Sequence, residues 1–463
     1  MEEQKKEIRN EIRTLSGVTP VAVLTKPFPC PGRCIFCPKE DGSPQSYLSR
    51  EPAVMRAITS QYHPRRQVDF RLKQYDRTNH STQKVELIVL GGTWSAYPKR
   101  YQSWFIKECL NSLNSGSAKT LAEAIRKNET AHHREIGLTI ETRPDLVDEQ
   151  EVKRLRSLGV TRVELGVQST NDEILRAVGR NHTTQEIIRA TRLLKDAGVK
   201  ILFHIMPGLP GSNPKEDLAV FKTLFSNPDY QPDMLKIYPC VVVPETKLYD
   251  WYKEGKYVPY TDQQLVSLLV KIKRLVPPYV RIMRLYRDIP AQYIAGGSIT
   301  SNMRQVVGEE LTRLNQSCRC IRCREIRNQA PEKALSLNRI DYEASGGKEI
   351  FLQMIDSYDR IYAILRLRIP SVIFLKGKIL FRVLDRASII RELHVYGSAT
   401  NLGEKGKVQH RGLGEKLIAE AEKITMDEFH LQKIAVISGI GVRNYYRKLG
   451  YELKQGYMVR EFK

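Results

Sequence analysis

Short apolar runs alternate with amphipathic helical stretches over residues 21–310. We expect seven β-strands there: Val21–Leu24, Val85–Leu90, Ile136–Glu141, Arg162–Val167, Val199–Met206, Met234–Tyr238 and Val280–Leu285. Helical periodicity lies between several of them, over Asp148–Leu158, Asp172–Val178 and Thr184–Ala197. This alternation predicts an α/β fold with a parallel sheet, an open or complete βα barrel whose active site lies at the carboxyl ends of the strands.

The pattern changes near residue 346. Strands are expected at Ile361–Arg368, Ile379–Leu384, Ser388–Val395 and Lys433–Ser438, and a helix at Val442–Leu449. The turn Gln409–Gly414 opens an amphipathic helix that runs through Met426, and such a glycine-rich turn offers backbone N–H groups to phosphates. We therefore expect a basic N-terminal segment (1–20), a barrel domain (21–310), a cysteine-rich linker (311–345) and an α+β domain (346–463).

Composition and charge narrow the class of protein. A content of 41% hydrophobic and 27% charged residues is typical of a globular chain. We recognise neither a signal peptide nor an apolar run long enough to span a membrane, and expect a cytoplasmic protein. The net charge of +22 favours a nucleic-acid partner over an idle basic surface. The segment His63–Arg77 mixes cations with aromatic residues as RNA-binding surfaces do, although a solvated helix face would look similar.

Three cysteines on one short loop carry the strongest chemical signal. Cys30, Cys34 and Cys37 have the spacing Cys-x3-Cys-x2-Cys, and an aromatic residue precedes the last. Three thiolates hold three irons of a 4Fe–4S cluster and leave the fourth iron open to a small molecule. A zinc knuckle is the alternative, but His63, the first histidine downstream, lies well outside the loop. The spacing resembles that of the radical S-adenosylmethionine (SAM) superfamily.

Polar and glycine residues follow several predicted barrel strands. Gly91 and Gly92 end the second strand, and their likeness to the SAM-contacting glycines of the superfamily makes them candidate SAM contacts. Gln168 follows the fourth strand and is a further candidate for cofactor binding. Taken singly, each would be an ordinary βα turn. Their coincidence with the cysteine loop at one edge of the sheet favours a binding site.

A second cysteine cluster lies between the two domains. Cys318, Cys320 and Cys323 suit tetrahedral zinc, although no fourth ligand is evident, and unligated surface cysteines are the alternative. Four arginines and one glutamate accompany them, so a structural metal there would brace a basic surface. Cys109 and Cys240 stand apart and are expected to be buried and reduced.

The second domain resembles the GNAT acetyltransferases, and the whole chain is similar to the family of the Elongator catalytic subunit. The resemblance is carried by the cysteine triplet, Glu392–Gly397, Gln409–Gly414 and Asn444–Gly450. It implies a stand-alone prokaryotic-type enzyme that uses SAM and acetyl-CoA to add a carboxymethyl group to carbon 5 of the wobble uridine of tRNA. An electron donor for the cluster is implied as well, and the residues leave open whether the chain forms a homodimer.

The resemblance also assigns residues to acetyl-CoA. The positions that match the family's acetyl-CoA motifs are Glu392, Leu393, His394, Val395, Gln409, Gly412, Leu413, Gly414, Glu415 and Tyr446. Lys84 matches a lysine that reaches acetyl-CoA, and Tyr446 and Lys84 are the candidate catalytic residues. The residues alone also allow a packed core histidine at 394 and a solvated lysine at 84.

Three rival functions remain compatible with parts of this pattern. A protein lysine acetyltransferase with a structural iron–sulfur domain would explain the second domain. A non-catalytic RNA-binding scaffold would explain the charge. A radical methylthiotransferase would have no need for an acetyl-CoA motif.

Overall fold

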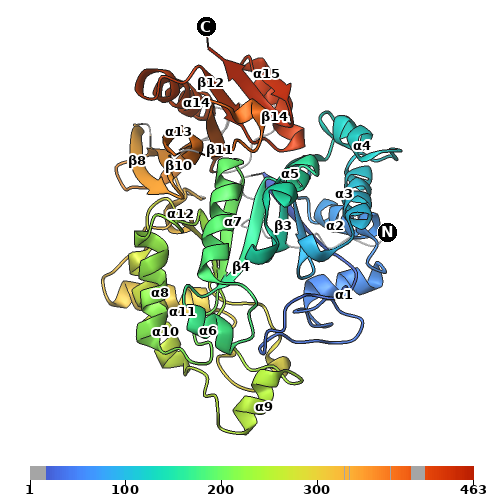
Figure 1. Cartoon of the computed structure of the whole chain (residues 1–463), viewed down its shortest axis with the longest axis vertical. Helices are drawn as coiled ribbons and strands as arrows, with labels where there is room; N and C mark the ends of the chain where they lie inside the picture. The colour runs from blue at the N-terminus through green and yellow to red at the C-terminus, as the bar shows by residue number, and fades with distance from the viewer. Residues whose placement is uncertain (1–16, 328, 333, 376, 398–411, 463) are drawn as a thin grey trace, which may run out of the picture.

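The computed structural model describes residues 17–462 apart from 328, 333, 376 and 398–411. Within this part of the chain the barrel domain and a second domain each form one sheet, and the second domain lies over one end of the first (Figure 1). None of the described helices has the length and apolar character needed to cross a membrane. The expected architecture, a partial βα barrel followed by an α+β domain, is confirmed.

The first sheet has seven parallel strands in chain order, with β1 and β7 at its two edges, so the barrel is open. The strands are β1 (Val18–Leu24), β2 (Lys84–Leu90), β3 (Arg134–Thr142), β4 (Arg162–Gln168), β5 (Lys200–Ile205), β6 (Met234–Ile237) and β7 (Arg281–Arg284). All seven predicted strands are present.

The helices of this domain lie mainly over the outer face of the sheet. They are α1 (Pro52–Thr59), α2 (Pro64–Arg77), α3 (Lys99–Leu113), α4 (Leu121–Asn128), α5 (Glu149–Ser157), α6 (Asp172–Ala177), α7 (Thr184–Asp196), α8 (Pro214–Ser226), α9 (Lys247–Lys253), α10 (Asp262–Leu275) and α11 (Met303–Arg313). Helix α7 shows why they form: Thr183 and Glu186 make a capping box, and Ile187, Ala190 and Leu194 bury one face.

The two faces of the barrel strands differ in polarity. In β2, Val85, Leu87 and Val89 are buried beneath the helices, whereas Lys84 and Glu86 point to the inside of the barrel. Because side chains alternate along a strand, the interior of the barrel receives charged residues while the outer face remains apolar. A closed, packed barrel core would exclude these charges, so the alternation marks a cavity.

The second sheet also has seven strands, in the order β13-β14-β12-β11-β10-β9-β8. Its strands are β8 (Ser336–Ala344), β9 (Gly347–Ile355), β10 (Ile361–Ile369), β11 (Ser388–Val395), β12 (Lys433–Val436), β13 (Glu452–Lys454) and β14 (Tyr457–Glu461). Strands β11 and β12 pair in parallel and the other neighbours are antiparallel. The accompanying helices are α12 (Ile321–Arg324), α13 (Ser371–Phe374), α14 (Leu413–Lys423) and α15 (Arg443–Lys448).

Two expectations for this domain differ from the structure. The predicted strand Ile379–Leu384 is wrong: Arg382–Leu384 forms a 3-10 turn, and the backbone N–H of Val383 donates to the Gln455 side chain instead of to a neighbouring strand. The expected boundary at residue 346 falls inside a hairpin, because β8 pairs along its length with β9. Most of β8 is exposed, so its apolar pattern is too weak to mark it in the sequence.

The second domain packs on the amino-terminal ends of the barrel strands. Gly439 lies so close to β3 that a Cβ atom there would come within 2.3 Å of the carbonyl carbon of Ile136. A buried ionic cluster adds to this interface: Arg391 on β11 donates to Asp233, which precedes β6, at 2.5 Å and to Glu349 at 2.9 Å. Removing one partner of such a buried pair typically costs about 3–5 kcal/mol. The orientation of the two domains is therefore well defined.

Candidate active site

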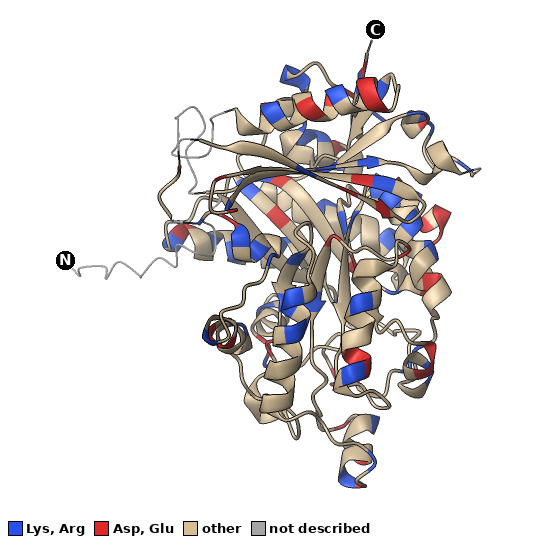
Figure 2. Cartoon of the chain, turned by 90° about the vertical axis from the view of Figure 1, so that its left-hand side faces the viewer, with Lys and Arg blue, Asp and Glu red and all other residues tan. Residues whose placement is uncertain are grey.

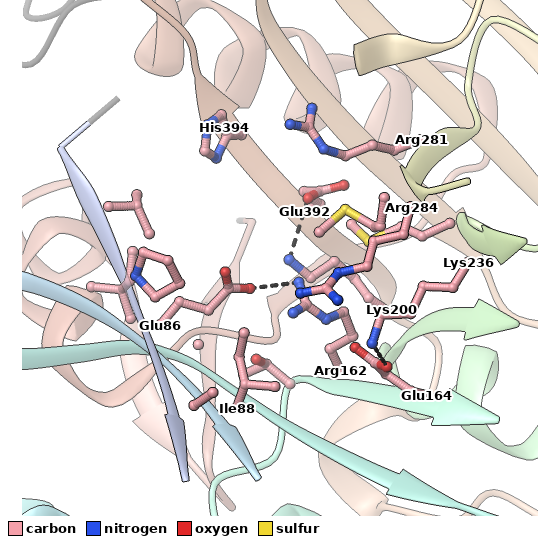
Figure 3. Close-up of a pocket in the computed structure, with 18 of the residues that line it drawn as sticks. Glu86, Ile88, Arg162, Glu164, Lys200, Lys236, Arg281, Arg284, Glu392 and His394 are labelled. Atoms are coloured by element: carbon pink, nitrogen blue, oxygen red, sulfur yellow. Dashed lines mark hydrogen bonds and ion pairs between the residues drawn. The ribbon is translucent and has the colours of Figure 1, made fainter. Parts of the chain in front are cut away.

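One cavity of about 1350 Å³ is lined by both domains. At the carboxyl ends of the barrel strands it reaches Cys37 and Gln168, and at the opposite end it reaches β11 and the start of α14. Figure 3 shows charged side chains from the barrel strands and from β11 pointing into the same space. The cavity therefore runs along the inside of the barrel from the cysteine loop to the second domain.

The cysteine triplet lies on the loop between β1 and α1. The Sγ atom of Cys30 is 3.3 Å from the Thr93 hydroxyl oxygen, just beyond β2, and Arg180 donates from Nη1 to the Sγ atom of Cys34 at 3.4 Å. The backbone N–H of Ile35 donates to the Val178 carbonyl, which ties the loop to the end of α6. All three sulfurs are free thiols.

The surroundings of this loop fit an anionic thiolate cluster. Burial, followed by the nearby thiol of Cys34, raises the pKa of Cys37 to about 12, so the thiolate form needs compensating positive charge. Arg143 lies beside Cys30 and Cys34, and its Nη1 is buried without a hydrogen-bond partner among the described residues. Three thiols with an unsatisfied arginine suit a 4Fe–4S cluster, whose iron atoms would take the place of the protons.

The two candidate SAM contacts, Gly91 and Gly92, and the cofactor-binding candidate Gln168 lie near this loop but differ in what they offer. The side chain of Gln168 lines the cavity, and its Oε1 is buried without a partner, so it can accept a hydrogen bond from a ligand. Gly91 and Gly92 have φ values of 124° and 92°, and a Cβ atom at Gly91 would lie 2.0 Å from the Thr25 hydroxyl. Neither glycine is among the residues that line the cavity. Their conformation thus has a packing reason, and SAM contact at both stays a prediction.

Ionic groups occupy the middle of the cavity. Glu86 pairs with Arg162 at 2.5 Å, and Glu164 accepts from His204 at 2.7 Å and pairs with Lys236 (Figure 3). Burial opposes ionisation of Glu164, but Lys236 and His204 outweigh it and lower its pKa, so the carboxylate stays charged. These residues were not predicted from the sequence, although charged residues at alternate positions of otherwise apolar strands indicate a polar interior of the barrel.

The other end of the cavity contains the predicted acetyl-CoA residues. Glu392, Leu393, His394 and Val395 on β11 line it, as do Gly412, Leu413, Gly414, Glu415 and Tyr446. Gln409 lies outside the described residues. A Cβ atom at Gly414 would lie 3.0 Å from the Tyr445 hydroxyl oxygen and 3.7 Å from Leu393 Cδ2, so the glycine keeps this space open.

Burial sets the protonation of the polar groups at this end. It lowers the pKa of His394 to about 4, so the imidazole is neutral near pH 7. It also raises the pKa of Tyr446, which keeps that phenol protonated. Burial opposes ionisation of Glu392, but Lys200 and Arg366 outweigh it and lower the pKa of its carboxyl.

The structure brings Lys84 to the second domain. Lys84 is the first residue of β2, lies opposite Arg134 on β3, and lines the same cavity as α14. Burial, and after it the charge of Arg134, lowers the pKa of Lys84. The view of this residue as a solvated surface lysine is therefore wrong.

The second cysteine cluster is compact. The Sγ atoms of Cys318, Cys320 and Cys323 all lie within 4.8 Å of one another, a spacing compatible with three thiolates on one zinc ion. No fourth histidine, cysteine or carboxylate joins this group among the described residues. Cys318 and Cys320 are buried, so the alternative of unligated surface cysteines does not describe them.

The open barrel and its cysteine loop define a radical SAM protein with an additional α+β domain. Residues 29–224 match the family described as the radical SAM superfamily, and residues 232–313 match the radical SAM C-terminal domain. The chain is 49% identical over 455 residues to the tRNA uridine(34) acetyltransferase of Dehalococcoides mccartyi (strain CBDB1), covering 97% of this chain and 98% of the relative.

More distant relatives extend the same similarity. Human Elongator complex protein 3 is 39% identical over 471 residues, covering 98% of this chain and 85% of that protein. The solved structure of archaeal Methanocaldococcus infernus Elp3 with an N-terminal deletion (1–46) superposes with a TM-score of 0.86 at 41% identity, covering 97% and 100% of the two chains. The chain belongs to the family of the tRNA uridine(34) acetyltransferases and Elongator complex protein 3. The resemblance inferred from its motifs is confirmed.

Proposed function

We propose that this protein modifies the wobble uridine of tRNA, adding a carboxymethyl group at carbon 5 with acetyl-CoA as two-carbon donor and SAM as radical source. The observation that carries the proposal is the single cavity that joins the cysteine loop to the acetyl-CoA motif. The relatives named for tRNA uridine(34) and the net charge of +22 support RNA as the substrate.

At the barrel end, Cys30, Cys34 and Cys37 would hold a 4Fe–4S cluster, supplied with electrons by a donor. The chemistry supplied by such a cluster with SAM bound would be a 5′-deoxyadenosyl radical able to take a hydrogen atom from the acetyl methyl group. Arg180 donates to the Sγ atom of Cys34 and so places a guanidinium group beside this ligand of the cluster. The unpartnered Oε1 of Gln168 gives a ligand in the cavity a hydrogen-bond acceptor.

At the other end, residues of the second domain would hold acetyl-CoA. The first backbone N–H groups of α14 have no partner within the helix and would be available to its phosphates, and Leu393 and Val395 offer an apolar wall for the thioester arm. The protonated Tyr446 phenol is a hydrogen-bond donor for the thioester carbonyl. Lys84 places a second donor on the barrel side of the same space. These donors would favour hydrolysis that releases coenzyme A once the two-carbon unit is attached.

The uridine would lie between these two ends. Addition at carbon 5 requires the base to approach the activated acetyl carbon, so the base must enter the cavity. The resulting base radical would then have to give up one electron, to an acceptor such as the oxidised cluster, and the carbon 5 proton. The ionic groups of Glu86, Arg162, Glu164 and Lys236 provide polar partners there in place of water.

Anaerobic incubation with labelled acetyl-CoA, SAM, a reductant and tRNA, followed by nucleoside analysis, tests the proposal. We expect labelled 5-carboxymethyluridine from the wild type and none from Cys34→Ser. Cys240→Ser is the matched control, because Cys240 is a buried thiol outside the triplet and its variant should retain the product. A wild type with an assembled cluster and no labelled nucleoside would refute the proposal.

The second candidate is a protein lysine acetyltransferase with a structural iron–sulfur domain, favoured only by the acetyl-CoA motif of the second domain. It predicts acetyl transfer to basic peptides that is unaffected by Cys34→Ser and not stimulated by tRNA. Labelled nucleoside that depends on Cys34 would exclude it.

A further inference from the structure

The arginines of the second cysteine cluster divide into two groups. Arg324 donates to Gln353 at 3.0 Å, and both Arg319 and Arg324 pair with Asp359, so these two guanidinium groups have partners outside the cavity, although Nη1 of Arg324 has no hydrogen-bond partner among the described residues. Arg322 and Arg327 instead line the large cavity, together with Glu325. The cluster therefore presents two of its cations to the proposed active site.

The cavity-facing group has more positive charge than its single carboxylate can balance. Arg304, Arg281 and Arg327 repel Arg322, whereas Glu325 attracts it. That carboxylate is already shared, since it pairs with Arg281 at 2.8 Å and with Arg327 at 3.5 Å. Figure 2 shows basic positions gathered across the middle of the molecule, where the two domains meet.

The guanidinium group of Arg322 also has an unsatisfied hydrogen-bond donor. Its Nε is buried and unpartnered among the described residues. A buried guanidinium N–H without an acceptor is costly, and a ligand that brings an oxygen anion would remove that cost. Arg322 lies in α12 between Cys320 and Cys323, and the backbone N–H of the preceding Ile321 donates to the Val280 carbonyl of the barrel at 3.0 Å.

We propose that Arg322, with Arg281 and Arg327, forms a subsite for a phosphate ester group that a substrate carries into the cavity. The choice of substrates rests on the proposed function, which offers two sources: a backbone phosphate of the RNA beside the modified nucleotide, or a phosphate of coenzyme A. Phosphate suits this place because a guanidinium can donate two parallel N–H groups to its oxygens.

The position of the subsite is within reach of both sources. Arg281 begins β7, and its Nη1 donates to the Tyr396 hydroxyl at 3.4 Å, just beyond the end of β11. The subsite thus lies between the barrel edge and the strand assigned to acetyl-CoA. Acetyl-CoA held along β11 would bring a phosphate toward this edge, and so would an RNA strand that enters the cavity here.

The test compares Arg322→Gln with Arg319→Gln in the full-length protein. Arg319 is a matched control because it lies on the same loop but pairs with Asp359 outside the cavity. We expect Arg322→Gln to lower the affinity for one ligand by about tenfold, the effect of losing a charge-assisted hydrogen bond. Arg319→Gln should change the affinity for neither ligand by more than about twofold. Equilibrium dissociation constants for tRNA, at several salt concentrations, and for acetyl-CoA are the measurements.

The two sources give different results. If RNA supplies the phosphate, Arg322→Gln weakens tRNA alone and reduces the slope of log Kd against log salt by about one. If coenzyme A supplies it, acetyl-CoA alone is weakened and 3′-dephospho-acetyl-CoA locates the phosphate. Arg322→Lys keeps the charge but not the paired donors, so its affinity for that ligand should lie between those of the wild type and Arg322→Gln. This variant replaces Arg322→Gln in the test if the glutamine variant unfolds.

Unchanged affinity for both ligands in Arg322→Gln, or an equal loss in Arg319→Gln, would overturn the subsite. These outcomes leave the proposed function standing, because modification of tRNA by the wild type is measured separately. A wild type that binds neither ligand would overturn both proposals.

Discussion

The carboxylate of Glu135, on β3 of the barrel, accepts a hydrogen bond from the backbone N–H of Ile440 in the second domain at 2.9 Å. Glu135 is buried, and its other carboxylate oxygen has no partner among the described residues. Burial raises the pKa of Glu135 to about 7, against the opposing effect of the Ile440 N–H. A group that ionises near neutral pH therefore lies within the contact between the two domains.

We predict that the stability of Glu135→Gln relative to the wild type increases between pH 6 and pH 8. Because the folded pKa exceeds the usual value of 4.5, the folded state binds the proton more tightly than the unfolded chain does. The resulting stability is complete below pH 4.5 and is lost as pH rises through 7. The wild type should lose about 1 kcal/mol between pH 6 and 8, and the amide, which cannot ionise, should not.

Chemical denaturation at the two pH values checks this expectation. Glu452→Gln on exposed β13 is the control and should follow the wild type. A constant difference between Glu135→Gln and the wild type across this pH range would show that the buried carboxyl does not titrate there.

The interface glycine gives a second prediction. Gly439 has φ −63° and ψ 161°, which alanine adopts without strain, so the only obstacle to a side chain is β3, where a Cβ atom would lie 2.3 Å from the Ile136 carbonyl oxygen. We expect Gly439→Ala to force the domains apart locally and to cost about 1–3 kcal/mol of stability. Thermal unfolding measures it. Gly116→Ala, with its nearest contact at 3.7 Å, should be close to neutral, and equal stability of the two variants would contradict the close approach.

The barrel was predictable because its signal is local. The outward-facing Val85, Leu87 and Val89 alternate with inward-facing charges, and this period-two pattern is readable without knowing any neighbour. The cysteine triplet was predictable for the same reason, since its spacing lies within one loop.

Contacts that depend on the placement of distant elements were not predictable. The pair between Glu86 and Arg162 requires the order of β2, β3 and β4 in the sheet, and the approach of Gly439 to Ile136 requires the packing of one domain on the other. The short run Ile379–Leu384 shows the reverse failure. Its local pattern favours a strand, but the Gln455 side chain occupies the backbone donor of Val383.

Our third prediction concerns the space beside β11. Gly414 lies in α14 without a positive φ, so the helix tolerates a larger residue, but a side chain there would enter the space bounded by Tyr445 and Leu393. We expect Gly414→Val to weaken acetyl-CoA at least tenfold while the affinity for tRNA stays within twofold.

Isothermal titration with each ligand measures both effects. Gly308→Val is the matched control, since Gly308 also lies in a helix and has open space around its Cβ position. If Gly414→Val lowers the affinity for both ligands equally, the substitution unfolds the domain or the two ligands share this space.

The exposed face of α2 is the last place where we predict a measurable effect. Gln67, Val68 and Tyr75 bury one side of the helix, which leaves Arg66, Phe70, Lys73 and Arg77 exposed at the spacing of a single helix face. We expect Arg66→Gln/Lys73→Gln/Arg77→Gln to weaken tRNA binding and to lower the salt slope by up to about three, because each lost phosphate contact contributes roughly one. Filter binding over a range of salt concentrations gives both values. Lys215→Gln/Lys222→Gln on the exposed face of α8 removes two charges elsewhere, so an equal effect per charge there would reveal attraction by net charge alone and no contact at α2.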